Sequence, residues 1–220
     1  MIVTLDYQCG CAGPEIGKAL ADRLDLAFYD KELLQQAAEE SDLDIRVIET
    51  FDETPSSGPL YAVAACSSGK VNYVKEGQPI AEQVYLAEYH AIQKLANERS
   101  CLFIGRCADY ILQDRADCLR FFVYAPLKSR ISHVAHCQNL DYQEAKTLVQ
   151  NTDQRRKAYY NSFSGKKWGH IENYHLCIDS SRQELADIVE TLCFTINRPH
   201  AAETLNTRAN GSCAADFAVV

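Results

Sequence analysis

The hydrophobic residues of the chain follow two alternating patterns. Short runs of apolar or β-branched residues are typical of buried strands, whereas apolar residues three or four positions apart are typical of helices with one buried face. Five short runs predict strands: Ile2–Leu5, Leu26–Tyr29, Cys101–Ile104, Leu119–Ala125 and His175–Asp179. The run Leu26–Tyr29 fits either a strand or a turn.

Helical spacing fills most of the chain between these runs. It begins after Pro14, covers 31–40 and continues over 42–50, resumes after Pro79 in the longest pattern, extends over 127–167, and ends with 185–196. Asp30 is a favourable N-cap for the second of these helices, and Ser181 to Glu184 has the spacing of a capping box before the last. Pro14, Pro79 and Pro126 each suit a first helical turn.

This alternation of strands and helices predicts an α/β fold, a three-layer sandwich with a mostly parallel central sheet and helices on both faces. We expect one domain over 1–198. Residues 52–70 are rich in Ser, Gly and Pro and predict a long mobile connection. Residues 199–220 lack periodicity and predict a loosely structured tail.

Composition narrows the classes of function. The chain is 47% hydrophobic, enough for a core, and its net charge of −8 argues against nucleic-acid and membrane-surface partners. With no secretory signal and no long apolar run, a cytoplasmic protein is expected. Its ten cysteines are therefore expected to be reduced thiols. His133–Cys137 and Cys9–Cys11 lack a second half at zinc spacing, so no metal site is predicted.

The first strand runs into a loop of small residues, Gly10, Cys11, Ala12 and Gly13, and then into a helix. Such a loop lets backbone N–H groups and the positive end of the helix dipole approach an anion. Gly17-Lys18 matches the end of a phosphate-binding P-loop motif, but Ala12 and Ala19 replace its first Gly and its hydroxyl residue. An ordinary strand-to-helix turn fits the stretch equally well.

A second candidate is Arg106, which directly follows the strand at Cys101–Ile104. Ligands of parallel sheets bind at the carboxyl ends of strands. An arginine there can hold a phosphate with two parallel hydrogen bonds, which a lysine cannot. The alternative is a structural ion pair with a carboxylate such as Asp109.

A third candidate is a basic cluster within 127–169, the range of a predicted helical lid. It comprises seven cations: Lys128, Arg130, Arg155, Arg156, Lys157, Lys166 and Lys167. Cations of this kind stabilise a transferring phosphoryl group, although a solvated basic helix face is the simpler explanation. Arg155 and Arg156 lie about 100° apart on a helix, so at most one should face a phosphate.

Taken together, several stretches resemble the cytidylate kinase-like family, a branch of the P-loop nucleoside-monophosphate kinases. The resemblance covers about residues 2–196 and rests on six segments: Gly10–Lys18, Phe28–Leu33, Ile104–Tyr110, Tyr124–Leu127, Asp153–Trp168 and Leu176–Ser181. The loop departs from the family pattern, with Tyr7 and Pro14 in place of arginines and Gln8 in place of glutamate.

The resemblance implies a nucleotide kinase with ATP and Mg²⁺ as cofactors. ATP would bind at Gly10, Cys11, Ala12, Gly13 and Lys18. A monophosphate acceptor, CMP-like, would bind near Asp30, Arg106 and Asp109. Arg130, Arg155 and Arg156 would act on the transferred group.

Three hypotheses therefore stay open: a kinase for a pyrimidine monophosphate, a non-catalytic nucleotide or anion sensor on the same fold, and a kinase for another small molecule. Nucleotides are the expected partners, and a homodimer is left open.

Overall fold

The computed structural model describes residues 1–41, 43–55 and 79–198. Its centre is a five-stranded sheet in the order β2-β3-β1-β4-β5, in which every strand pair is parallel. The strands are β1 (Ile2–Tyr7), β2 (Ala27–Tyr29), β3 (Cys101–Ile104), β4 (Cys118–Tyr124) and β5 (Leu176–Asp179). The predicted parallel α/β sandwich is confirmed.

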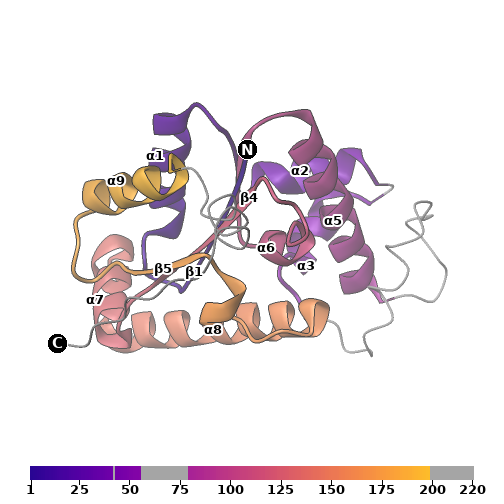
Figure 1. Cartoon of the computed structure of the whole chain (residues 1–220). Helices are drawn as coiled ribbons and strands as arrows, with labels where there is room; N and C mark the ends of the chain where they lie inside the picture. Colours follow the sequence, from indigo (N-terminus) through magenta and orange to yellow (C-terminus); the bar gives the residue numbers. More distant parts are fainter. Residues whose placement is uncertain (42, 56–78, 199–220) are drawn as a thin grey trace.

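Helices cover both faces of this sheet (Figure 1). Their bounds are α1 Gly13–Leu24, α2 Glu32–Glu39, α3 Ile45–Phe51, α5 Ile80–Glu98, α6 Ala108–Ile111, α7 Leu127–Gln138, α8 Tyr142–Ser164 and α9 Leu185–Ile196, with a 3₁₀ turn at Ile171–Asn173. In Figure 1, α1 and α9 lie above the sheet, α7 and α8 lie below it, and α2, α3, α5 and α6 gather to the right of its labelled strands.

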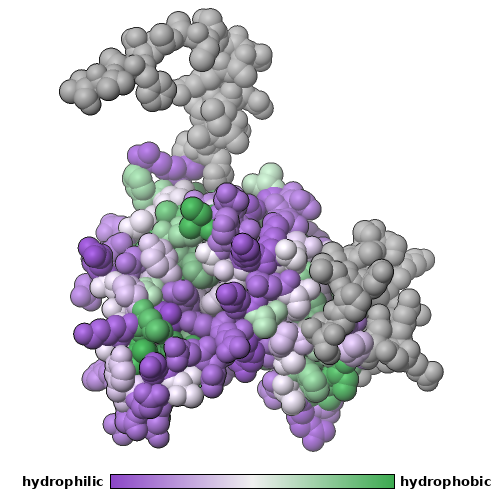
Figure 2. Space-filling model, turned by 90° about the horizontal axis from the view of Figure 1, so that it is seen from below, coloured by the Kyte–Doolittle hydropathy of each residue, from purple (hydrophilic) through white to green (hydrophobic). Residues whose placement is uncertain are grey.

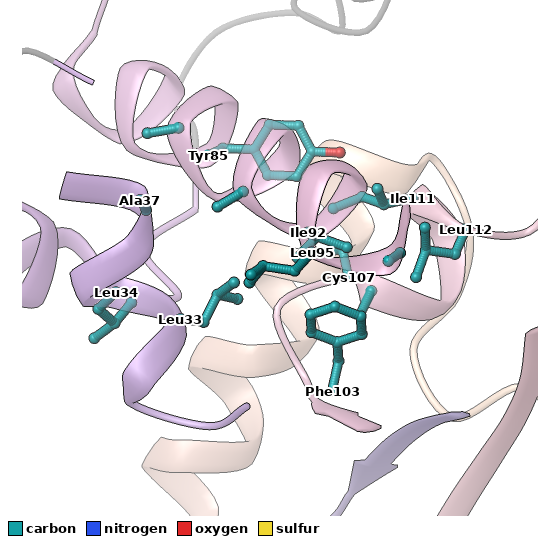
Figure 3. Packing of buried hydrophobic residues seen from close by; sticks show 14 of the residues in the cluster. Leu33, Leu34, Ala37, Tyr85, Ile92, Leu95, Phe103, Cys107, Ile111 and Leu112 are labelled. Atoms are coloured by element: carbon teal, nitrogen blue, oxygen red, sulfur yellow. The ribbon is translucent and has the colours of Figure 1, made fainter. Parts of the chain in front are cut away.

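The side chains of β1 point alternately to the two faces of the sheet, and each face has its own hydrophobic cluster. Val3 and Leu5 of β1 pack into the cluster of α1 and α9, whereas Ile2 packs into the cluster of α2, α5 and α8. Figure 3 shows this second cluster, with Phe103 of β3 beneath Leu33 of α2 and the residues of α5. Because both faces are buried, the strands read as continuous apolar runs.

Local hydrogen bonds correct two predicted caps. The Ser181 hydroxyl donates to Asp179 Oδ1 at 2.7 Å, and α9 has no side-chain cap at its start. The capping box lies instead at α8, where Asp141 accepts backbone N–H bonds and Glu144 accepts the Asp141 N–H. Asp30 does not cap α2, because its carboxylate accepts from Arg106.

The predicted helical lid consists of α7 and α8, separated by Asn139 in the left-handed conformation with φ 52. The end of α8 belongs to the core, since Tyr159, Tyr160 and Phe163 are all buried. The face seen from below is mostly hydrophilic, with hydrophobic side chains in small separate patches (Figure 2). A lid that moves over its whole length is therefore not favoured by this packing.

Several expectations fall partly outside the described residues. These are the connection after residue 55, the tail 199–220, and the thiols Cys66 and Cys213. The eight described cysteines are unpaired. Among the residues that the structure describes, no helix combines the length and hydrophobicity needed to cross a membrane.

Three buried carboxylates accept hydrogen bonds from aromatic side chains of α8 and the turn that follows it. Asp6 accepts from Trp168 Nε1 at 2.7 Å, Asp109 accepts from the Tyr160 hydroxyl, and Glu88 accepts from the Tyr159 hydroxyl at 2.8 Å. Burial, with the nearby Asp52 carboxylate, raises the pKa of Glu88 to about 8. Burial also raises the pKa of Asp6 to about 7 and that of Asp109 to about 6.

We expect the Glu88→Gln variant to lose less stability than the parent protein as the pH rises. A carboxyl with a raised pKa binds more protons folded than unfolded, so its contribution is lost between its ordinary pKa near 4.5 and about 8. Across that range, the free energy of unfolding of the variant should decline less steeply, by up to about 1.4 kcal/mol per pH unit. Urea unfolding from pH 5 to 8 measures this.

Glu98→Gln, an exposed change on the same helix, is the matched control and should follow the parent protein. If Glu88→Gln declines as steeply as the parent, Glu88 is not held neutral by the fold.

Candidate active site

The loop between β1 and α1 takes a conformation that small residues permit. Gly10 has φ 88 and Ala12 has φ 55, both in the left-handed region. A Cβ on Gly10 would lie 2.7 Å from the Arg130 carbonyl oxygen, and a Cβ on Gly13 would overlap the Tyr7 ring. Close neighbours therefore require glycine at both positions, and at Gly10 the backbone conformation favours it as well.

A buried ion pair fastens this loop to α7 and α8. Arg130 Nη1 donates to Asp153 Oδ2 at 2.6 Å and to the Cys9 carbonyl at 3.0 Å, while Nε donates to the Ala125 carbonyl at 3.0 Å. Asp153 Oδ1 accepts the Cys9 N–H at 2.8 Å. Arg130, predicted to act on the transferred group, is thus committed to holding the backbone at the ends of β1 and β4.

One cavity, of about 320 Å³, has residues of this loop in its wall; we call it the donor cavity, after the ATP that the family resemblance implies at this loop. The loop supplies Gly10, Cys11 and Ala12 to its wall, and α7 supplies Ser129 and His133. The rest of the wall comes from Ile16, Ala125, Ser180, Ser181, Gln183, Glu184, Leu185 and Ile188. Its polar and apolar side chains suit a nucleoside, while the loop amides suit phosphate.

Lys18 is not in the wall of this cavity. It lies in the second turn of α1, where its exposed ammonium pairs with Asp22. Among the described residues, the lining contains neither lysine nor arginine. A phosphate there must be neutralised by the loop amides, by the dipole of α1 or by a cation from outside this wall.

A second cavity, of about 260 Å³, is lined by Asp30 and Arg106; we call it the acceptor cavity, after the acceptor that the family resemblance implies near these two residues. Tyr7 and Pro14 form the wall next to the loop. The rest of the lining is mostly charged, with Lys31, Arg106, Arg155 and Arg156 facing Asp30, Asp52 and Glu53, alongside Ile104 and Gly105.

Arg106 is brought together with Asp30, as predicted, but its principal partner is Asp52. Arg106 Nε and Nη2 donate to the two oxygens of Asp52 at 3.0 and 2.9 Å, and Nη1 donates to Asp30 at 3.1 Å. Burial alone would lower the pKa of this guanidinium, but Asp52 and Glu88 raise it well above its ordinary value. Arg106 is 7% exposed, so its charge is largely neutralised within the protein.

Arg156 and Arg155 differ in their surroundings. Arg156 donates to Glu53 Oε2 at 3.0 Å and to the Tyr7 hydroxyl at 2.9 Å, and its guanidinium lies 4.3 Å from the centre of the Tyr7 ring. The Arg155 side chain is 55% exposed, and its Nη2 lies 3.9 Å from the same Glu53 oxygen. The side chain with room to move toward a phosphate is therefore that of Arg155.

Asp109 lies apart from the residues that line the acceptor cavity. It is buried against the Tyr160 hydroxyl at 2.7 Å and makes no ion pair with Arg106 among the described contacts. The structure therefore gives Asp109 a place in the core.

Sequence reasoning missed Asp52 and Glu53 as parts of the site, and it did not identify Arg130 as the partner of Asp153. Asp52 and Glu53 opened a segment that reads as a loop, and Glu53 has φ 51, unusual for a residue with a side chain. Asp153 stood among basic residues. Adjacent acids directly after a helix were the available signal, but only the tertiary fold shows which arginines they meet.

We expect Asp153→Asn to destabilise the fold by about 3–5 kcal/mol, because it leaves buried Arg130 without its counter-charge. Gln150→Ala, an exposed change on the same helix, should change the free energy of unfolding by less than about 0.5 kcal/mol. Urea unfolding compares the two. An unchanged midpoint in Asp153→Asn would show that this pair does not secure the loop.

A solved structure described as an uncharacterized protein from Eubacterium ventriosum ATCC 27560 superimposes with a TM-score of 0.69 at 24% identity, covering 90% of this chain and 98% of the other. A shikimate kinase from Bacteroides thetaiotaomicron has a TM-score of 0.49 at 13% identity, covering 90% and 99%. A search of curated proteins gave no match.

The family model described as the cytidylate kinase-like family matches residues 2–182. This range includes all five strands, the loop after β1 and every residue that lines the acceptor cavity. Phosphoryl transfer is the general chemistry that such a family supports. The chain belongs to the cytidylate kinase-like family.

Proposed function

We propose that the protein transfers a phosphoryl group from ATP to a nucleoside monophosphate, with a CMP-like pyrimidine as the expected acceptor. One observation carries the proposal: a single stretch, from the end of β1 to the start of α1, contributes to the walls of two cavities. The donor cavity uses Gly10, Cys11 and Ala12 of the loop, and the acceptor cavity uses Tyr7 and Pro14, which flank it. A phosphoryl group bound at this stretch would therefore lie near both cavities.

The loop of the donor cavity supports an ATP site, and the cavity volume of about 320 Å³ lies in the general range of ligand pockets. The left-handed backbone at Gly10 and Ala12 exposes a cradle of small side chains at the start of α1, which has no side-chain cap of its own. Apolar contacts from Leu185 and Ile188 on α9 and polar atoms from Gln183 supply surroundings for a base and a sugar.

Mg²⁺ fits as an ion that arrives with the nucleotide. The described residues contain no group of three side chains that could hold a metal by themselves. Kinase Mg²⁺ is held mainly by substrate phosphates, water and one or two carboxylates, and Asp30 in the acceptor cavity is a suitable oxygen donor. Bound Mg²⁺ would neutralise charge on the phosphates.

Arg155 has the role closest to the chemistry. Catalysis of phosphoryl transfer depends on positioning and charge neutralisation. Arg106 and Arg156 are fixed by carboxylates and shape the cavity, whereas Arg155 can turn toward the loop from an exposed position. Acceptor oxygen attack on the terminal phosphate forms one P–O bond, and the bond to ADP breaks.

A non-catalytic nucleotide sensor is the second candidate. It is favoured by the donor-cavity lining, in which the described residues include no lysine or arginine, and by Pro14, which offers no N–H to a phosphate. Such a protein would bind ATP without turning it over.

We expect ADP release in a coupled assay with ATP, Mg²⁺ and CMP, and a lower rate with purine monophosphates. The same assay without an acceptor gives the background rate. ATP-analogue binding without turnover on any nucleoside monophosphate would instead establish the sensor, and turnover only with another small molecule would correct the acceptor.

In an active protein, Arg155→Ala should lower turnover by about 10³-fold or more, in the range of an arginine finger. Its melting temperature should stay near that of the parent, because its ion pair is long and exposed. Arg156→Ala should mainly lower the melting temperature, since it leaves Glu53 unpaired. Equal turnover in Arg155→Ala and the parent would exclude this role for Arg155.

A further inference from the structure

The acceptor cavity contains a carboxylate on the cations that an anionic ligand would need. Glu53 lies two residues after the end of α3, and its side chain is 13% exposed. A single oxygen, Oε2, lies 3.0 Å from Arg156 Nε and 3.9 Å from Arg155 Nη2. This carboxylate therefore occupies the position between the two arginines.

The neighbouring residue repeats the arrangement. Asp52 forms two parallel hydrogen bonds with Arg106, which is the geometry that arginine offers to a phosphate. Three of the four cations in the cavity wall thus have an internal carboxylate as a partner, and those carboxylates come from one short turn.

We propose that Glu53 is a specificity-determining residue that competes with the anionic group of an acceptor for Arg155 and Arg156. The inference rests on the proposed function for its ligand, an acceptor with a phosphate group. We also infer that the cavity excludes small free anions, because such an anion must displace the Glu53 carboxylate without providing it with a new partner.

An acceptor that also carries hydroxyl groups can compensate the displaced carboxylate. Glu53 and Asp30 both line the cavity and accept hydrogen bonds. A sugar monophosphate therefore replaces the lost ion pair with a phosphate–arginine pair and a hydroxyl–carboxylate bond. Inorganic phosphate supplies only the first of these.

The test is the affinity of the intact protein for inorganic phosphate, measured by calorimetry without ATP. If the state with Glu53 displaced is populated one time in ten or less, the apparent affinity is reduced by about tenfold or more. Glu53→Gln should then bind phosphate at least about tenfold more tightly than the parent, and phosphate should raise its melting temperature more.

Glu49→Gln is the matched control, because it removes the same charge from an exposed position on α3 and should leave phosphate affinity unchanged. Glu53→Asp withdraws the carboxylate by one methylene group while keeping its charge, and should give a smaller gain. It also serves if Glu53→Gln fails to fold.

Equal or weaker phosphate binding in Glu53→Gln, or in Glu53→Asp where only that variant folds, overturns the proposal. It would mean that Glu53 only holds the arginines in place. A gain equal to that of Glu49→Gln would also overturn it, since net charge alone would explain the effect. The experiment needs no turnover, so absence of kinase activity would refute the proposed function and leave this result standing.

Discussion

The ion pair between Arg130 and Asp153 determines where both cavities lie. Arg130 is bound to the backbone at Cys9 and Ala125, the chain segments that leave the adjacent strands β1 and β4, while Asp153 reaches the same loop from α8. A buried charge must keep its partner, because an unpaired one is strongly unfavourable. The loop, α7 and α8 are consequently held together, and they supply residues to both cavities: the loop and α7 to the donor cavity, and α8 to the acceptor cavity.

The aromatic residues of α8 and the following turn have a similar structural role. Tyr159, Tyr160 and Trp168 lie within the range of the predicted lid, but they donate hydrogen bonds to the buried acids Glu88, Asp109 and Asp6. Burial of three acids behind one sheet is unfavourable unless donors meet them. The aromatic pattern is therefore explained by the interior of the protein, and only the charged groups beside it are left to meet ligands.

The sequence predicted the sheet well because buried parallel strands leave continuous apolar runs. The family resemblance also implied that Asp30 and Arg106 lie near the same acceptor, and the two side chains are paired in the structure. The sequence could not predict that Asp52 meets Arg106, that Glu53 meets Arg156 or that Lys18 turns away. These outcomes depend on which side chains the fold brings together across distant segments. Pairing partners of charged residues carry no local sequence signal.

The unusual residues of the loop are coupled to one another. The Tyr7 ring lies against Gly13, and its other contacts hold Arg156, whose Nη1 also reaches the Tyr7 carbonyl at 3.3 Å. A side chain at 13 would displace this ring and with it the arginine. Tyr7 thus brings a cation from α8 to the start of the loop. Charge at this end of the sheet depends on a contact between β1 and α8, so a substitution of Tyr7 would also change the surroundings of Arg156.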